Sequence, residues 1–316
     1  MEEQKSQINE VKKIIGGIAD KLPEFCSDES ISRYLRARNW NTKKAAKMLK
    51  ETLKWRLQSK PEKITWEDVV DEAETGKVYR ANFCDKNGRI VLIMRPGLQG
   101  TQSKSSSSCG GHIKYLVYCM ENATMNVKTD EEQMVWLIDF QGWKMGCISV
   151  KQTREAAHLL QHHYPERLGL AIFYNPPKIF ESFWTMVKPF LEQKTYRKVK
   201  FVHSDNPHSQ ILMQELFDMD KLESAFGGKN TNGFNCVAYS QMMREDDEKK
   251  LHFLNSNTSF SSSPLTIKSL QSNLSDQYDS EDSDESHSSS SSSGDELDVC
   301  ATLASVDGKA PTMFVN

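Results

Sequence analysis

Few residues in this sequence combine in a way that could perform covalent chemistry. His162 and His163 are adjacent in a segment with helical character, so their side chains point about 100° apart and share no face. This arrangement favours a place on a helix surface or at the edge of a core over an acid–base or metal-binding pair. Asp139 ends an apolar, strand-like run without a nucleophile or metal ligand beside it, so we expect it to form structural hydrogen bonds.

Motifs for nucleotide binding and serine hydrolysis are absent from the sequence. The chain has no G-x-G-x-x-G and no G-x-x-x-x-G-K-[ST] motif, and the glycines of residues 110–114 (GGHIK) have the wrong spacing to hold a phosphate. It also lacks a G-x-S-x-G motif and a basic patch with interleaved aromatic residues. We therefore expect a protein that is not an enzyme, with no catalytic residue, no cofactor and no nucleic-acid partner.

Hydropathy and cysteine usage predict a cytoplasmic protein. The longest apolar runs, near residues 135–138 and 170–174, are far shorter than the ~18–20 residues of a transmembrane helix. Residues 1–5 (MEEQK) lack the apolar stretch of a secretory signal. The seven cysteines are dispersed without a CxxC pair, which indicates reduced thiols instead of disulfides or a zinc site.

Charge is distributed unevenly along the 316 residues, although the formal net charge is only −3. Residues 251–316 contain ten acidic and two basic residues, a net charge of −8, which leaves +5 on residues 1–250. A basic body is attracted to anionic membrane leaflets by about 1 kcal/mol for each well-placed basic residue. The charge pattern therefore predicts peripheral association with membranes.

The elements that would position functional side chains fall into two folded regions. Apolar residues recur at helical spacing in residues 1–76, which predicts an N-terminal helical region with Asp28 and Asn41 as N-caps. Strand-like and helical patterns alternate in residues 77–243, which predicts an α/β fold with a mostly parallel sheet. The predicted strands are residues 89–95, 134–140, 170–175 and 198–203, and the predicted helices are residues 112–124, 150–164, 177–192 and 207–218.

Residues 244–316 are predicted to form a disordered, serine-rich acidic tail. Seventeen serines lie between Ser256 and Ser293, and such a segment buries too little apolar surface to offset the entropy of ordering it. An alternative is a short binding helix built on Phe260, Leu265, Ile267, Leu270 and Leu274. The tail is also a candidate binding site for a protein partner.

Six strings of this sequence resemble the CRAL-TRIO family, in its phosphatidylinositol-transfer branch. They occur in the family's order and spacing across about residues 27–228. The strings are YLRARNWNTKKAAKMLKETLKWR, CDKNGRIVLI, WLIDFQG, HHYPERLGLAIFYNPP, VKPFLEQKTYRKVKFV and LESAFGG. The resemblance implies a sheet that floors an apolar cavity, one lipid held within it, and a mobile helix that acts as a gate.

Residues 177–192 match the gate helix of that family, and we call them the gate segment. Their apolar residues exceed the single stripe of an ordinary surface helix, although a buried core helix would have a similar composition. Lys178, Lys188, Lys194, Arg197 and Lys200 lie in or beside the segment and are expected to face an anionic membrane. The residues expected to line the gate and the acyl cavity are Ile179, Phe180, Phe183, Trp184, Val187, Phe190 and Leu191.

The resemblance also implies a binding site for the lipid headgroup. The family's phosphatidylinositol pocket corresponds here to Arg38, Glu166, Thr195 and Lys198. Lys198 and Thr195 would hold the phosphate through charge-assisted hydrogen bonds. Glu166 would accept hydrogen bonds from inositol hydroxyls or orient a cation, and Arg38 would pair with Glu166.

The chain departs from the family's phosphatidylcholine-binding branch at four positions. Met134 and Trp136 stand where that branch has hydroxyl residues, and Arg80 and Met120 stand where it has tyrosines. Phosphatidylinositol is therefore the expected ligand, and the identity of a second lipid stays open. Two functions fit: exchange or presentation of the lipid at cytoplasmic membranes, or lipid sensing by an adaptor whose tail recruits a partner such as a lipid kinase.

Overall fold

The computed structural model describes residues 2–98, 110–127, 132–147 and 150–259, without the side chains of residues 253–259. The N-terminal region contains α1 (Glu2–Ile15), α2 (Asp28–Ala37) and α3 (Thr42–Ser59), with the 3₁₀ turns η1 (Gly16–Lys21) and η2 (Pro23–Phe25) after α1. Helix α1 ends where Gly16 adopts a φ of 61°, in the left-handed region that favours glycine. This confirms the predicted helical character of the region.

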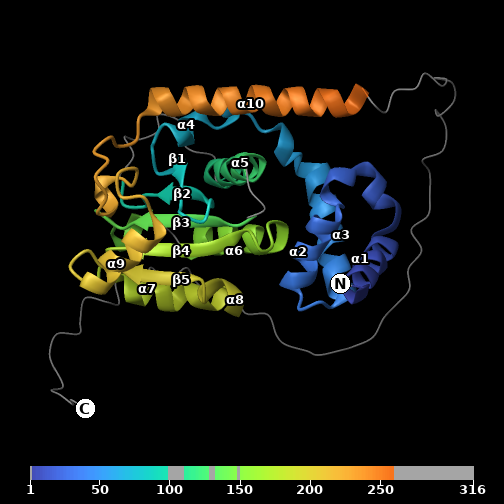
Figure 1. The fold of residues 1–316 in the computed structure, drawn as a ribbon, viewed down its shortest axis with the longest axis horizontal. Helices are drawn as coiled ribbons and strands as arrows, with labels where there is room; N and C mark the ends of the chain where they lie inside the picture. The colour runs from blue at the N-terminus through green and yellow to red at the C-terminus, as the bar shows by residue number, and fades with distance from the viewer. Residues whose placement is uncertain (1, 99–109, 128–131, 148–149, 260–316) are drawn as a thin grey trace, which may run out of the picture. The chain divides into compact units, whose positions relative to one another are not determined.

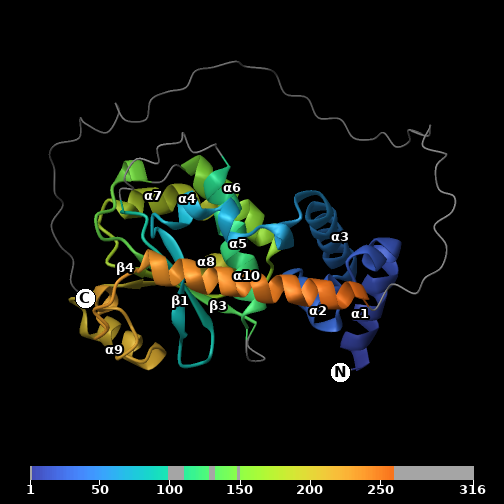
Figure 2. The same ribbon diagram turned by 90° about the horizontal axis from the view of Figure 1, so that it is seen from above.

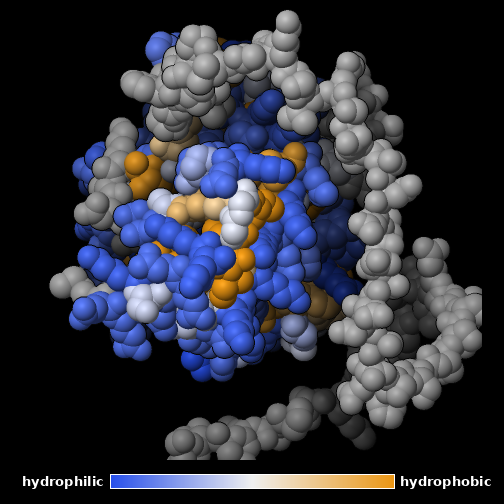
Figure 3. All heavy atoms as spheres, turned by 90° about the vertical axis from the view of Figure 1, so that its right-hand side faces the viewer, coloured by the Kyte–Doolittle hydropathy of each residue, from blue (hydrophilic) through white to orange (hydrophobic). Residues whose placement is uncertain are grey.

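The three N-terminal helices pack their apolar stripes against one another. Val11, Leu35 and Leu49 are fully buried in their shared core. Seen from the side of these helices, the surface is mostly hydrophilic with a narrow hydrophobic band (Figure 3). The helices therefore form a core of their own beside the sheet.

The two predicted N-caps of this region have different outcomes. Asn41 caps α3 as predicted, since its Oδ1 accepts a hydrogen bond from the Lys44 amide at 2.9 Å. The cap of α2 is Ser27 instead of Asp28, because Asp28 is already the first helical residue and Ser27 Oγ accepts from the Ser30 amide at 3.2 Å. Asp28 instead pairs with Lys12 of α1 at 2.5 Å.

Five strands form one sheet, which confirms the predicted α/β fold. They are β1 (Val78–Cys84), β2 (Ile90–Met94), β3 (Met134–Asp139), β4 (Leu168–Tyr174) and β5 (Val199–Val202). They lie in the order β1-β2-β3-β4-β5, with β1 antiparallel to β2 and the remaining neighbours parallel (Figure 1). Strand β1 has no counterpart among the predicted strands.

The helices that connect the parallel strands lie on one side of the sheet. They are α5 (Gly111–Met125), α6 (Val150–His163) and α7 (Phe180–Val187) (Figures 1 and 2). Right-handed crossovers between parallel strands that follow in sequence order require this placement. The remaining described elements are η3 (Pro61–Lys63), η4 (Trp66–Asp68), α4 (Val70–Ala73), η5 (Met145–Cys147), η6 (Lys188–Phe190), α8 (Gln193–Tyr196), α9 (Pro207–Leu216), η7 (Ser224–Phe226) and α10 (Cys236–Ser259).

The two faces of the sheet bury different side chains, because successive residues of a strand point to opposite sides. Val135 and Leu137 lie on the first face, in a core with Met213 of α9 and with Phe217 and Phe226. Trp136, Ile138 and the Ala171 and Phe173 side chains of β4 lie on the second face. The second face is therefore the one that α7 covers.

The predicted tail boundary at residue 244 requires correction, because α10 continues through it to Ser259. Asp246 is buried and pairs with Arg80 of β1 at 2.6 Å. Asp247 is also buried and accepts a hydrogen bond from the Trp66 amide at 2.6 Å. Residues 244–259 therefore belong to helix α10. The rest of the predicted tail, including the candidate binding helix, lies in residues 260–316, outside the described residues.

Candidate functional site

The N-terminal ends of two neighbouring strands bring Glu166 and Lys198 together. Glu166 precedes β4 and Lys198 precedes β5, and these strands are parallel with Ala171 paired to Val199. Lys198 Nζ lies 3.3 Å from Glu166 Oε2 and donates to the Leu168 carbonyl at 2.7 Å. The predicted carboxylate and ammonium therefore meet at one end of the sheet.

Glu166 adopts an unusual backbone conformation, with a φ of 58°. Left-handed backbone costs a residue with a side chain about 1 kcal/mol, and such strain tends to persist at functional sites. Here it occurs in the turn between α6 and β4, directly before the partly buried Arg167. Burial of Arg167, with the charge of Arg33 nearby, lowers the pKa of Arg167 to about 10, so it stays protonated at neutral pH.

The Glu166–Lys198 pair is partly buried and retains capacity for a further acceptor. The two side chains are 17% and 23% exposed. A lysine ammonium has three N–H donors, and the contacts among the described residues use two of them, to Glu166 and to the Leu168 carbonyl. The third donor is available to an anionic group.

Thr195 lies one turn before Lys198, in α8. The Lys198 amide donates to the Thr195 carbonyl at 3.0 Å, which places the two residues on one turn of backbone. The Thr195 side chain is partly buried, and its hydroxyl forms no hydrogen bond within the part of the chain that the structure describes. Of the four predicted headgroup residues, Glu166 and Lys198 are therefore in direct contact, and Thr195 lies one turn before Lys198.

Arg38 has a different partner from the predicted one. Its Nη1 lies 3.1 Å from Glu192 Oε1 and 3.2 Å from the Ala37 carbonyl, and its described contacts do not include Glu166. Glu192 is the N-cap residue of α8, and its carbonyl accepts from the Thr195 amide at 2.8 Å. Arg38 thus reaches the site through Glu192, a residue that sequence reasoning did not select.

The gate segment covers the second face of the sheet beside this site. Phe180, Phe183 and Val187 are buried at 3–4% exposure against the side chains of that face. The remaining cavity residues differ: Trp184, Phe190 and Leu191 are half-buried, and Ile179 is 56% exposed. The predicted single helix is interrupted, because Pro189 lacks the amide hydrogen for a helical bond and the chain continues as η6 and then α8.

Comparison with known families identifies this fold and its N-terminal helices. The CRAL/TRIO domain family matches residues 73–228, and the CRAL/TRIO N-terminal domain family matches residues 7–51. The chain belongs to the CRAL-TRIO family. The crystal structure of Sfh5 shares the CRAL-TRIO fold of this chain, with a TM-score of 0.63 and 18% identity over 82% of this chain and 98% of that one.

Curated CRAL-TRIO relatives include proteins named for phosphatidylinositol transfer. PDR17 of Saccharomyces cerevisiae, a phosphatidylinositol transfer protein, is 36% identical over 61% of this chain and 57% of its own length. CSR1 of Eremothecium gossypii, also a phosphatidylinositol transfer protein, is 26% identical over 70% of this chain and 52% of its own. A CRAL-TRIO domain-containing protein of Schizosaccharomyces pombe, C23B6.04c, is 32% identical over 63% of this chain and 19% of its own length. The chain thus spans between a fifth and just over half of these relatives.

The residues that first suggested chemistry have structural roles in this CRAL-TRIO chain. The His163 ring stacks on Trp55 at 4.3 Å, and burial lowers the pKa of His163 to about 4. The His162 ring stacks instead on His158 at 4.0 Å, so the two histidines face different partners. Asp139 Oδ1 accepts from the Gln141 amide at 2.9 Å, as expected for a structural hydrogen bond.

The side chains at the four positions that depart from the choline-binding branch pack in the core or form an ion pair. Met134 and Met120 are buried together in one apolar cluster with Tyr164. Trp136 packs against the same cluster, and Arg80 pairs with Asp246. None of these side chains supplies a hydroxyl group to a ligand.

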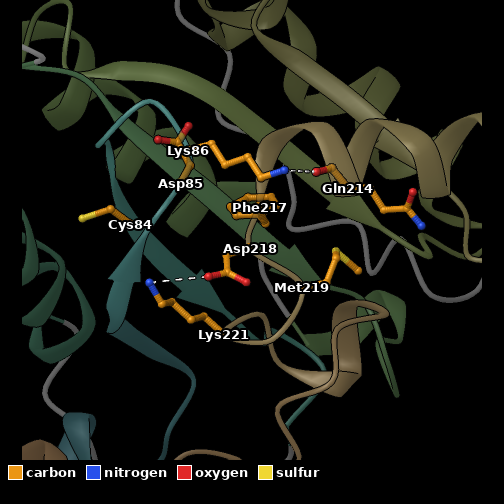
Figure 4. Close-up of a pocket in the computed structure, with 8 residues that line it drawn as sticks. All are labelled: Cys84, Asp85, Lys86, Gln214, Phe217, Asp218, Met219 and Lys221. Carbon is orange, nitrogen blue, oxygen red and sulfur yellow. Dashed lines mark hydrogen bonds and ion pairs between the residues drawn. The ribbon is translucent and has the colours of Figure 1, made fainter.

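Two pockets of the CRAL-TRIO chain lie elsewhere. The first, of about 600 Å³, lies where the end of β1 meets the segment after α9 (Figure 4). Two lysines bond locally there: Lys86 Nζ donates to the Gln214 carbonyl at 2.7 Å, and Lys221 lies 3.5 Å from Asp218. The second, of about 940 Å³, is lined by parts of α3, α5 and α6. None of the four predicted headgroup residues lines either pocket.

Residues 2–98, 110–127, 132–147 and 150–259 contain neither a membrane-spanning helix nor a cluster of metal ligands. Within these ranges, every helix is too short or too polar to cross a bilayer. No cluster of three or more potential metal ligands occurs in the same ranges.

Proposed function

We propose that this protein binds one molecule of phosphatidylinositol and exchanges or presents it at cytoplasmic membrane surfaces without covalent chemistry. The observation that carries the proposal is the Glu166–Lys198 pair, 3.3 Å apart at one end of the sheet beside an apolar gate segment. The names of PDR17 and CSR1 support the same lipid class. The departures at Met134, Trp136, Arg80 and Met120 argue against phosphatidylcholine as the main ligand.

The headgroup would be bound by the residues around Lys198. The free donor of Lys198 and the Thr195 hydroxyl would donate to the phosphate, and Arg38 would contribute a second positive charge. Glu166 would accept hydrogen bonds from the inositol hydroxyls, because a carboxylate beside the phosphate would be repelled. The arrangement thus separates a phosphate-binding part from a sugar-binding part.

The acyl chains would occupy the space between the second face and the gate segment. Each methylene is worth about 0.8 kcal/mol when it leaves water, but the chains start in a bilayer that is as apolar as the proposed cavity. Exchange is then nearly thermoneutral, and the protein's task is to lower the barrier. Since α7 packs directly on the second face, entry of a lipid requires α7 to move.

Docking on a membrane would use the outer surface of the gate segment. Ile179 and Phe201 are 56% and 44% exposed, and the Phe201 ring contacts Trp184 at a centroid distance of 5.9 Å. Lys178 and Lys188 are exposed and add positive charge in this segment. Exposed apolar groups together with basic residues fit an anionic leaflet.

A vesicle transfer assay tests the proposal and its main alternative. Donor vesicles contain labelled phosphatidylinositol or labelled phosphatidylcholine, and acceptor vesicles are unlabelled. We expect transfer of phosphatidylinositol and little transfer of phosphatidylcholine. Binding of phosphatidylinositol without transfer would support a lipid-sensing adaptor, and transfer of phosphatidylcholine alone would refute the headgroup assignment.

A further inference from the structure

A single amide side chain ties the end of the gate segment to α6. Gln161 Nε2 donates to the Phe190 carbonyl at 2.9 Å, and Gln161 Oε1 accepts from the Glu192 amide at 2.6 Å. The side chain thus pairs with two backbone groups on either side of Leu191, much as a neighbouring peptide unit would. Gln161 is partly buried and lies in the last turn of α6, two residues before His163.

Glu192 connects this tie to the headgroup site. Its backbone amide bonds Gln161, its carbonyl accepts from the amides of Thr195 and Tyr196 at 2.8 and 3.2 Å, and its carboxylate pairs with Arg38. A second bond runs in parallel, since Lys194 Nζ donates to the Arg36 carbonyl at 2.8 Å. Residue 192 therefore joins α6, α2 and α8 at the point where the gate segment ends.

We propose that Gln161 is a positioning residue for the headgroup site and that Glu192 holds Arg38 in an ion pair that the lipid phosphate replaces. Gln161 fixes the backbone that leads into α8, which carries Thr195 and precedes Lys198. Glu192 occupies the guanidinium of Arg38 while no phosphate is bound. The inference rests on the proposed function, because it assumes a phosphate-bearing lipid.

The exposure of the Arg38–Glu192 pair makes replacement feasible. The two side chains are 20% and 43% exposed, so the pair is screened by solvent and easily exchanged. A phosphate accepts two parallel hydrogen bonds from a guanidinium, and it repels a carboxylate at the same cation. The Gln161 bonds are between uncharged groups and persist whichever anion Arg38 binds, so the two roles can be tested separately.

Amide exchange of the lipid-free protein, followed by NMR, tests the role of Gln161. In Gln161→Ala we expect exchange at the Glu192 amide to rise at least ~5-fold, the size of one lost hydrogen bond. Gln161→Glu retains the acceptor for that amide and loses only the donor to Phe190, so a smaller rise is expected. Gln193→Ala, an exposed neighbour in α8, serves as the matched control and should leave the exchange unchanged. Equal exchange in Gln161→Ala and wild type would overturn the positioning role, whatever lipid the protein binds.

Binding to vesicles of nine parts phosphatidylcholine to one part phosphatidylinositol tests the role of Glu192. Glu192→Gln should bind phosphatidylinositol ~2- to 5-fold more tightly than wild type, because Arg38 is released from its internal partner. Glu215→Gln removes an exposed carboxylate of α9, outside the gate segment, and should have no such effect. In an Arg38→Ala background the gain from Glu192→Gln should disappear.

Three outcomes would contradict this inference in distinguishable ways. Equal or weaker binding by Glu192→Gln would overturn the competition between Glu192 and the phosphate. An equal gain with and without Arg38 would show that Glu192 acts through the general charge of the surface instead. If wild type binds no phosphatidylinositol, the proposed function fails together with the competition, while the amide-exchange result still decides the role of Gln161.

Discussion

The pair formed by Glu166 and Lys198 concentrates the headgroup chemistry in two side chains. They come from segments 32 residues apart, and the register of β4 and β5 brings them together. Lys198 already neutralises Glu166 and retains one N–H donor, so one residue links the sugar-binding and phosphate-binding parts of the proposed site.

Lys198→Ala is therefore expected to weaken phosphatidylinositol binding by about 10- to 100-fold, since a hydrogen bond to a charged group contributes about 1.5–3 kcal/mol. Lys200→Ala is the matched control, because Lys200 is exposed and lies on the opposite face of β5 from Val199 and Phe201. Retention of a fluorescent phosphatidylinositol, measured for both variants, checks the prediction. Equal retention by the two variants would contradict the assignment of Lys198.

His163 predicts a pH dependence of stability. Burial lowers its pKa to about 4 in the folded protein, against about 6.5 in the unfolded chain. The unfolded state therefore binds the proton first, and stability is lost as the pH falls from about 6.5 to about 4. The loss is at most about 3 kcal/mol and smaller because the ring is partly exposed.

Urea unfolding at pH 7 and pH 5 measures this effect. His163→Phe keeps a ring against Trp55 without a titrating nitrogen, so its free energy of unfolding should fall less than that of wild type between the two pH values. His208→Gln, an exposed replacement on α9, should behave as wild type. An identical pH dependence in His163→Phe and wild type would show that His163 does not titrate as described.

The sequence identified individual residues of the site more reliably than it identified their interaction partners. The family motif pointed to Arg38, but its expected partner was Glu166, and the structure pairs it with Glu192, 154 positions away in the chain. Gln161 carries no motif signal, because a glutamine on a helix is usually a solvated surface residue. Both contacts depend on how α2, α6 and α8 pack, which local sequence does not encode.

At the scale of elements, α7 presents apolar residues on two sides. Phe180 and Phe183 face the sheet, whereas Met186 of α7 and its N-cap residue Ile179 are 40% and 56% exposed. An ordinary surface helix has one apolar stripe. The second, exposed set is therefore the part available to a membrane.

The double variant Ile179→Ser with Met186→Ser is expected to reduce binding to anionic vesicles at least ~10-fold, because it removes two exposed apolar anchors. Its melting temperature should stay within about 3 °C of wild type, since substitutions of exposed residues are usually within about 0.5 kcal/mol each. Val237→Ser, which replaces a 78% exposed residue at the start of α10, is the control. Vesicle co-sedimentation checks the result, and a loss of binding in Val237→Ser as well would contradict a docking surface at the gate.

Helices and strands with a strong apolar periodicity were predicted correctly, whereas those that depend on tertiary contacts were missed. Strands β2 to β5 and helices α5, α6 and α9 were predicted from their apolar patterns, and the structure confirms them with shifts of one or two residues at most ends. Strand β1 (VYRANFC) mixes arginine and asparagine with apolar residues, and it forms by pairing with β2. The predicted tail began at residue 244, yet Asp246 and Asp247 are buried and accept hydrogen bonds from Arg80 and from the Trp66 amide.

At the scale of the whole molecule, α10 connects strand β1 and helix α5 to the segment around Trp66 that precedes the sheet. Asp246 accepts hydrogen bonds from Arg80 of β1, from Asn122 of α5 and from Asn126, the C-cap residue of α5. Asp247 accepts from the Trp66 amide and the Tyr118 hydroxyl. These contacts join residues more than one hundred positions apart in the sequence. If α10 is removed, its buried polar partners are left without hydrogen bonds.

Truncation after Met243 is therefore expected to destabilise the protein by about 3–5 kcal/mol, the cost of removing one partner of a buried ion pair. The corresponding fall in melting temperature is on the order of 10 °C. Truncation after Ser259 keeps all of α10 and should leave the melting temperature within about 2 °C of the full chain. Thermal unfolding of both variants checks this, and equal melting temperatures would contradict the role assigned to residues 244–259.

The central claim is that the chain carries phosphatidylinositol, and mass spectrometry of the lipids that copurify with the full-length protein tests it most directly. The account predicts phosphatidylinositol in wild type and in Lys200→Ala, and its loss in Lys198→Ala. Recovery of choline lipids alone from wild type, or of phosphatidylinositol from Lys198→Ala at the wild-type level, would contradict it.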